Sequence, residues 1–175
     1  RVPSMRVIRA PRLKLEPQLV AHADAMFDVL SDPAIYAHEN APPASVSWLR
    51  ERFARLETRW SGDGREQWLN WVIRLAPGEL AGYVQATVRG DGTAAIAYVL
   101  GSACWGRGLA QEAVAAMIAE LAARYRVRRL TAVFKTRNER SRRLLERLEF
   151  VAASPARCAA SGIERDESMM VRALQ

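Results

Sequence analysis

The feature that most constrains how this chain folds is a glycine-containing stretch, residues 105–108 (WGRG), between two segments of different periodicity. Before it, residues 93–100 form a short apolar run typical of a strand, and after it residues 109–124 repeat apolar side chains at helical spacing. Two glycines at a strand-to-helix junction let the main chain approach a ligand closely, and the helix behind them offers unpaired N–H groups at its positive end. The stretch therefore predicts either a cradle for an anion or an ordinary tight turn before a helix.

Two well-known ligands of glycine loops are disfavoured by the spacing. A dinucleotide-binding fingerprint would need a glycine at the position of Gln111, and a P-loop would need Gly-Lys-Ser or Gly-Lys-Thr, which the sequence lacks. The anion expected in the cradle is therefore a phosphate-bearing molecule other than a nicotinamide dinucleotide or a nucleoside triphosphate.

The remaining segments predict one mixed α/β domain that spans residues 1–175. Glycine turns of hairpin length join three strand-like runs into an antiparallel meander, and the strand after the helix returns parallel to the last of them through a right-handed crossover. We expect strands at residues 7–15, 68–75, 80–88, 93–100 and 127–134, a closing hairpin of residues 150–153 and 167–174, and helices at residues 17–30, 45–56, 109–124 and 138–150. Residues 1–4, which precede Met5, are either a tag or an extended start.

Composition and charge argue against several other classes of protein. The formal net charge of +7 comes almost entirely from arginines that are scattered along the chain, and no aromatic run accompanies them, so nucleic-acid binding is disfavoured. Cys104 and Cys158 lie far apart, and His22 and His38 alone do not build a zinc site, so we expect no metal. No apolar stretch approaches the roughly 20 residues of a membrane span, and we expect a cytoplasmic protein without membrane contact.

Ser141 occupies an unusual position for a hydroxyl. The helix expected at residues 138–150 places it on the same face as Leu144, Leu145 and Leu148. A hydroxyl on a buried face needs a hydrogen-bond partner. Ser141 therefore either bonds back to the carbonyl one turn earlier or faces a functional site.

Three motifs and the order of the elements resemble the GNAT superfamily of N-acetyltransferases, in the branch that includes the bacterial ribosomal-protein N-terminal acetyltransferases. The motifs are IAYVL at residues 96–100, WGRGLAQEA at residues 105–113, and NERS at residues 138–141 followed by LEF at residues 148–150. The second is similar to the family's pyrophosphate loop, Gln/Arg-x-x-Gly-x-Gly/Ala, with Trp105 at its first position. The resemblance covers nearly the whole chain. It implies a GNAT-type acyl-CoA N-acyltransferase fold, in which helices flank a central, mostly antiparallel sheet with one splayed pair of parallel strands.

The resemblance also implies acetyl coenzyme A as the co-substrate, no metal, and direct attack of a neutral primary amine on the thioester. The pyrophosphate is expected on the glycine loop, the pantetheine arm along the strand before it, and Asn138 on the other side of the coenzyme. The residues expected to bind the coenzyme are Tyr98, Val99, Leu100, Trp105, Gly106, Arg107, Gly108, Leu109, Ala110 and Asn138.

For catalysis, the resemblance assigns to Ser141 the donation of a proton to the leaving thiolate, since Leu145 stands where many family members have a tyrosine. The base is less well specified. The resemblance places Glu39 and His38, in the loop between the first two helices, near the acceptor, and either could take the proton directly or through water. Glu112 either acts as a base or only favours the dipole of its helix. Glu149 stands where the family usually has glycine, so the turn there is either left-handed, at a cost of roughly 1 kcal/mol, or different.

The acceptor is predicted from the weakness of the base. An α-amine, with a pKa of about 8, is closer to neutrality at pH 7 than a lysine side chain at about 10.4, so the site favours a protein or peptide N-terminus. Two alternatives stay open: a small amine such as an antibiotic, polyamine or amino acid, which an acidic mouth around Asp32 and Glu39 would favour, and a non-catalytic acyl-CoA-binding module. The sequence leaves open whether the chain is a monomer or a homodimer.

Overall fold

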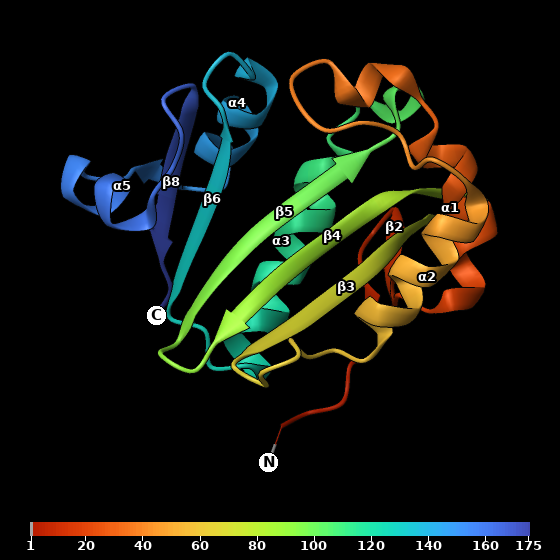
Figure 1. Cartoon of the computed structure of the whole chain (residues 1–175), viewed down its shortest axis with the longest axis horizontal. Helices are drawn as coiled ribbons and strands as arrows, with labels where there is room; N and C mark the ends of the chain where they lie inside the picture. Colours follow the sequence, from red (N-terminus) through yellow and green to blue (C-terminus); the bar gives the residue numbers. More distant parts are fainter. Residues whose placement is uncertain (1) are drawn as a thin grey trace.

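In residues 2–175, which the computed structural model describes, the strands form one mixed eight-stranded sheet in the order β1-β2-β3-β4-β5-β6-β8-β7 (Figure 1). Arg1, the first of the residues interpreted as a tag or an extended start, lies outside the described residues. The strands are β1 Ile8–Arg9, β2 Leu13–Pro17, β3 Glu66–Leu75, β4 Leu80–Arg89, β5 Thr93–Leu100, β6 Arg129–Lys135, β7 Val151–Ala152 and β8 Glu167–Ala173. The helices are α1 Ala23–Leu30, α2 Val46–Glu57, α3 Leu109–Arg124, α4 Glu139–Arg147 and α5 Pro155–Ser161, with 3₁₀ turns η1 Val20–His22, η2 Pro33–Tyr36 and η3 Ser102–Cys104.

The predicted meander and parallel strand pair are confirmed. β3, β4 and β5 pair antiparallel in chain order, and β5 pairs parallel with β6 after the crossover helix α3. Helices cover both faces of the sheet, and the two-residue period of β3 shows which face each helix covers. Val72 packs with residues of α1 and α2, whereas Trp71 and Ile73 pack in the larger core that contains α3.

The start of the chain differs from the single strand expected at residues 7–15. It forms two short strands joined by a turn in which the Ala10 amide donates to the Leu13 carbonyl over 2.9 Å. Pro11 lies in this turn, where its lack of an N–H costs no sheet hydrogen bond. The helix expected from residue 17 begins later, because Pro17 is still paired with Trp71 as the last residue of β2.

The closing hairpin forms, but it contains a helix that the sequence prediction does not include. α5 lies between β7 and β8, which pair antiparallel. The Ser154 hydroxyl accepts a hydrogen bond from the Arg157 amide, and Pro155 occupies the first turn. Gly162 then ends the helix with φ 65°. These are ordinary helix start and stop signals. The helix was not predicted because the segment between them is short and contains no large apolar residue.

Glu149 adopts the left-handed conformation that its position suggested. Its φ is 67°, and the Phe150 amide donates to the Leu145 carbonyl over 2.9 Å to close the end of α4. A glycine would adopt this φ without the steric penalty of a side chain. The turn therefore has the shape that the family resemblance implies, at some cost in strain.

Candidate active site

The parallel strands β5 and β6 diverge in the middle of the sheet. Their pairing covers only residues 93–95 of β5, while β4 remains paired with β5 as far as Leu100 and β8 pairs with β6 along its whole length. Residues 96–100 therefore have a free edge toward β6, and the two strands separate toward the upper part of Figure 1. The predicted splay is thus present, and it gives β5 unpaired main-chain groups beside an opening.

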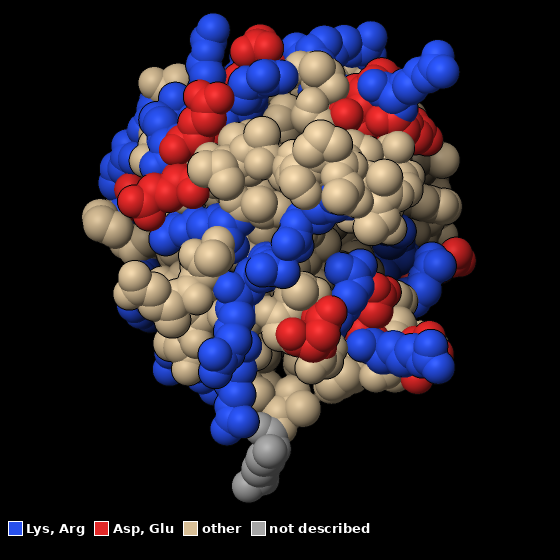
Figure 2. Space-filling view, turned by 90° about the vertical axis from the view of Figure 1, so that its left-hand side faces the viewer, with Lys and Arg blue, Asp and Glu red and all other residues tan. Residues whose placement is uncertain are grey.

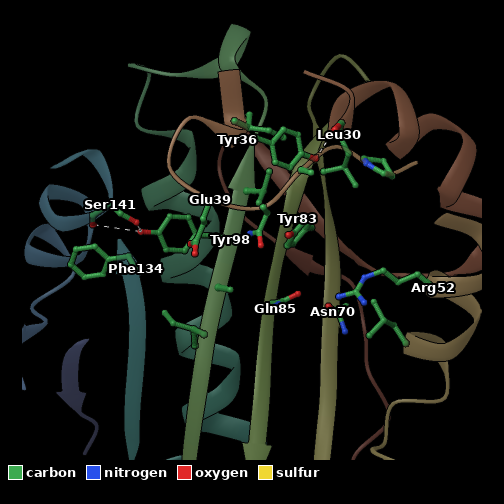
Figure 3. Close-up of a pocket in the computed structure, with 18 of the residues that line it drawn as sticks. Leu30, Tyr36, Glu39, Arg52, Asn70, Tyr83, Gln85, Tyr98, Phe134 and Ser141 are labelled. Carbon is green, nitrogen blue, oxygen red and sulfur yellow. Dashed lines mark hydrogen bonds between the residues drawn. The ribbon is translucent and has the colours of Figure 1, made fainter. Parts of the chain in front are cut away.

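A cavity of about 550 Å³ occupies this opening and extends beneath α1 and α2 (Figure 3). Several of the predicted site residues line it: Glu39, Tyr98, Val99, Asn138 and Ser141. The residues of the glycine loop and the start of α3, together with Leu100, continue from the end of β5 but are not part of its lining.

The glycine loop follows η3 and presents free main-chain amides. Gly106 and Gly108 have φ of 78° and 73°, and Gly108 is the N-cap of α3 without a capping side chain. Within residues 2–175, the amides of Gly106, Arg107 and Gly108 donate to no other group. Trp105 is fixed beside them, because its indole Nε1 donates to the Leu100 carbonyl over 2.8 Å. The loop therefore has the geometry of a cradle for an anion at the positive end of a helix.

Glu112 lies on the outer side of this loop, away from the cavity. Its carboxylate accepts hydrogen bonds from the Arg12 amide and from Arg12 Nε, each over 2.8 Å. Arg12 Nη1 also donates to the Arg107 carbonyl over 2.7 Å. The hydrogen bonds between Glu112 and Arg12 thus hold the N-terminal segment against the glycine loop. Glu112 itself does not line the cavity.

Ser141 and Tyr98 meet across the splay. The Ser141 Oγ lies 2.6 Å from the Tyr98 hydroxyl, so the serine makes no bond back to its own helix and its partner comes from β5. Asn138 caps α4, and its Oδ1 accepts a hydrogen bond from the Ser141 amide over 3.1 Å. Burial raises the pKa of Tyr98, while the hydrogen bond with Ser141 acts in the opposite direction. Both hydroxyls therefore carry protons at neutral pH, and they form a short chain at the opening.

The loop between α1 and α2 covers the opening between β5 and β6, and a hydrogen bond on each side of the opening holds it in place. The Asp32 carboxylate accepts from the Ser102 amide over 2.8 Å, and its hydrogen bonding to the side chain and the amide of Ser102 lowers the pKa of Asp32. On the other side, Arg137 Nη2 donates to the His38 carbonyl over 2.9 Å. Glu39 follows at the exposed rim of the cavity, whereas Asp32 is outside it, so the acidic mouth considered in the sequence does not form.

The wall of the cavity formed by the sheet contains polar side chains that sequence reasoning missed. Asn70 of β3 stands opposite Gln85 of β4, and Tyr83 lies on the same face two residues away. Within the described chain, the side chains of these three residues form no hydrogen bond with another residue. Burial raises the pKa of Tyr83 to about 12, so its hydroxyl stays a neutral donor. Polar residues at alternate positions in otherwise apolar strands are the signal that could have revealed this surface.

A family model for the acetyltransferase (GNAT) domain matches residues 12–151. The chain belongs to the GNAT acetyltransferase family. It is therefore an acetyl-CoA-dependent acyltransferase that acts on amines, and the resemblance seen in the sequence is confirmed at the level of the family. None of the curated protein sequences compared with this GNAT chain matches it.

Solved structures share the fold over nearly the whole chain. RimL, a ribosomal α-N-protein acetyltransferase in complex with coenzyme A, has 18% identity and a TM-score of 0.82, and covers 97% of this chain and 98% of its own. A GNAT acetyltransferase from Bacillus anthracis has 19% identity and a TM-score of 0.76. The match covers 96% of this chain and 98% of the other. The microcin self-immunity acetyltransferase MccE, in complex with acetyl-CoA and AMP, has 16% identity, a TM-score of 0.77 and coverage of 94% and 93%. Identities this low show the fold and do not fix the branch.

The surface of the described residues carries charges of both signs. On the face shown in Figure 2, Lys and Arg side chains are spread among Asp and Glu side chains and a broad uncharged area. Ion pairs among the described residues include Arg142 with Glu139, and Lys135 with Glu164. In residues 2–175 there is no group of three or more His, Cys, Asp or Glu that could hold a metal ion. No helix in the same residues is both long and apolar enough to cross a membrane.

Proposed function

We propose that this GNAT enzyme transfers the acetyl group of acetyl coenzyme A to the α-amine of a protein or peptide N-terminus. The observation that carries the proposal is the free edge of β5, residues 96–100, because it joins the amides of the glycine loop to the cavity that holds Ser141 and Glu39. The similarity in fold to RimL, which is named for α-N-protein acetylation, supports the same branch.

The coenzyme would be held mainly by main-chain groups. The amides of residues 106–110 would receive the pyrophosphate, and the free main-chain groups of β5 from Tyr98 to Leu100, other than the Leu100 carbonyl that Trp105 occupies, would bond to the amides of pantetheine. Asn138 uses its Oδ1 to cap α4, so its NH₂ group would be the part that contacts the coenzyme. Trp105 would hold the loop at the end of β5 in a fixed position through its bond to Leu100.

In the reaction, the amine nitrogen forms a bond to the thioester carbonyl carbon and the carbon–sulfur bond breaks. Glu39, at the rim, would accept the proton that the amine loses, directly or through water. Ser141 would donate a hydrogen bond to the leaving thiolate, with Tyr98 holding the serine hydroxyl in place. The proton that finally resides on coenzyme A balances the one lost by the amine.

The α-amine is favoured because the cavity offers no strong base. The lining groups that could accept a proton are the Glu39 carboxylate and the His38 imidazole, and Glu112 is bonded to Arg12 outside the cavity. Deprotonating a lysine side chain at pH 7 would cost roughly 4.6 kcal/mol, against roughly 1.4 kcal/mol for an α-amine. A site of this kind is better suited to the acceptor that is already partly neutral.

The test combines coenzyme binding with an amine panel. Acetyl coenzyme A should raise the melting temperature, and thiol release should be faster with peptides that have a free α-amine than with the same peptides blocked at the N-terminus and carrying an internal lysine. Faster release with polyamines or aminoglycosides would assign the enzyme to small amines. Stabilisation by the coenzyme without release for any amine would indicate a binding module.

A further inference from the structure

Arg52 is an exposed cation at the cavity, and no carboxylate of residues 2–175 forms an ion pair with it. It lies on α2, lines the cavity and points toward β3 and β4 in Figure 3. Its guanidinium contacts the Trp48 ring, with 5.9 Å to the ring centroid, and forms no ion pair with another residue in the described range 2–175. Arg50, on the same helix, is instead paired with Asp24 over 2.8 Å. Arg52 thus brings an uncompensated positive charge to the substrate cavity.

Neutral hydrogen-bond donors surround the same end of the cavity. The amides of Asn70 and Gln85 are opposite each other on adjacent strands, and the Tyr83 hydroxyl lies on the same face. Burial is the main cause of the raised pKa of Tyr83; Tyr36 and Glu39 also raise it and Arg52 lowers it, so Arg52 and Glu39 are both near enough to act on this hydroxyl. Gln18, 3% exposed, adds a buried Oε1 that has no hydrogen-bond partner within residues 2–175, and this oxygen would accept an N–H of a bound molecule. A cation beside several neutral donors is the usual chemistry of a carboxylate-binding site.

The two charges that line the cavity belong to different ends of it. Glu39 is at the rim near the opening, whereas Arg52 approaches the strands from α2 (Figure 3). An amine that reacts at the splay beside β5 is about two strand spacings from β3, which is roughly 10 Å. The cavity is therefore arranged for an acceptor with its amine at one end and an anionic group at the other.

We propose that the acceptor is a peptide N-terminus with an aspartate or glutamate in its second or third position, and that Arg52 binds this carboxylate. The inference rests on the proposed function. An extended peptide advances by about 3.3–3.6 Å per residue, so an acidic side chain at these positions reaches across roughly 10 Å, whereas the carboxylate of a free amino acid is too close to its amine. Polyamines and aminoglycosides are disfavoured because Arg52 repels their additional positive charges.

The experiment compares kcat/KM for peptides that begin Ser-Asp-Glu, Ser-Asn-Gln and Ser-Lys-Lys and are otherwise identical. With the unmodified enzyme, the acidic peptide should be preferred over the amide peptide by about tenfold, as expected for a charge-assisted hydrogen bond. Arg52→Ala should abolish this ratio, and Arg52→Glu should reverse the order of the acidic and lysine peptides. Arg50→Ala on the same helix is the matched control and should leave the ratio unchanged.

Other outcomes would overturn the inference in distinguishable ways. Equal kcat/KM for the acidic and amide peptides, or a preference that survives Arg52→Glu, would reject Arg52 as the specificity residue while leaving α-amine acetylation intact. A free amino acid or an amine that carries a phosphate, used faster than any peptide, would place a different anion in the cavity. Absence of turnover with every amine would remove the proposed function together with this inference.

Discussion

The two sides of the cavity are built in different ways. The side proposed to bind the coenzyme, called the coenzyme side below, comes from one continuous part of the chain, from β5 through the glycine loop, α3 and β6 to α4, and it presents mainly main-chain groups. The acceptor side combines the loop between α1 and α2 with side chains that project from β3 and β4. Main-chain groups arranged by glycine and strand pairing suit a co-substrate that every family member shares, whereas side chains can change without altering the fold. Changes on the first side should therefore abolish coenzyme binding, and changes on the second should alter the choice of acceptor.

The largest effect is expected for Gly108→Val. Gly108 has φ 73°, where a branched side chain is strained, and a Cβ there would lie 3.4 Å from Arg12 Nη2, so the substitution should distort the main chain of the loop. Affinity for acetyl coenzyme A, measured by isothermal titration calorimetry, should fall at least about 100-fold. Gly62→Ala is the control, because nothing lies within 4 Å of a Cβ at that position. If Gly108→Val binds the coenzyme with unchanged affinity, the glycine loop does not bind it, and the proposed division into a coenzyme side and an acceptor side is wrong.

Ser141→Ala should affect turnover rather than coenzyme binding. Loss of one donor to developing negative charge lowers kcat by about 100-fold in comparable sites, while the coenzyme affinity should change less than about threefold. Tyr98→Phe should lower kcat less, since it removes only the partner of Ser141. Thr136→Val is a matched control, because it removes a hydroxyl that is paired with Ser168 over 2.8 Å outside the cavity. An equal loss of kcat and coenzyme affinity in Ser141→Ala would assign the serine to binding or packing.

Glu112→Gln tests whether this carboxylate acts on the coenzyme side or in proton transfer. The substitution weakens the hold of Arg12 on the glycine loop, so the coenzyme Kd should rise about threefold to tenfold. At saturating coenzyme, kcat and its pH profile should stay as they are. A large fall in kcat with an unchanged Kd would instead identify Glu112 as the base.

The smallest expected effect is a gain of stability for Glu149→Gly. Relief of the left-handed conformation should add roughly 1 kcal/mol to the free energy of unfolding. Loss of the exposed ion pair with Arg172, at 3.3 Å, should offset little of this gain. Glu146→Gly, which places the same residue inside α4, is the control and should lower stability by a similar amount in urea denaturation. Destabilisation by Glu149→Gly would contradict the strain at this turn.

The same contrast explains how much of the molecule could be predicted from the sequence. The glycine loop, the parallel return of β6 and the inward position of Ser141 follow from local spacing, because periodicity and turn residues act over a few neighbours. The pairing of Ser141 with Tyr98 could not be predicted, since it depends on how far two strands diverge. The role of Glu112 could not be predicted either. Its position in the first turn of a helix is evident from the sequence, but nothing local indicates that its partner is Arg12, 100 residues away.

The acceptor side is the part of the site that the sequence predicts least well. Asn70 and Gln85 interrupt apolar strands, but only the register of β3 with β4 puts them side by side, and only the packing of α2 brings Arg52 to the same cavity. Within the expected hairpin, α5 was missed although its capping residues are standard. Local signals thus predicted the shape of the coenzyme side, while the chemistry of the acceptor side required tertiary structure.

The central claim is that the amides of the glycine loop and the free edge of β5 direct the thioester to the hydroxyl pair of Tyr98 and Ser141. A crystal structure with acetyl coenzyme A tests it most directly. We predict the pyrophosphate within hydrogen-bond distance of amides in residues 106–110, the pantetheine between β5 and β6, and the sulfur next to the Ser141 hydroxyl. A coenzyme bound outside the splay, or a sulfur that leaves the Tyr98–Ser141 pair out of contact, would contradict the account.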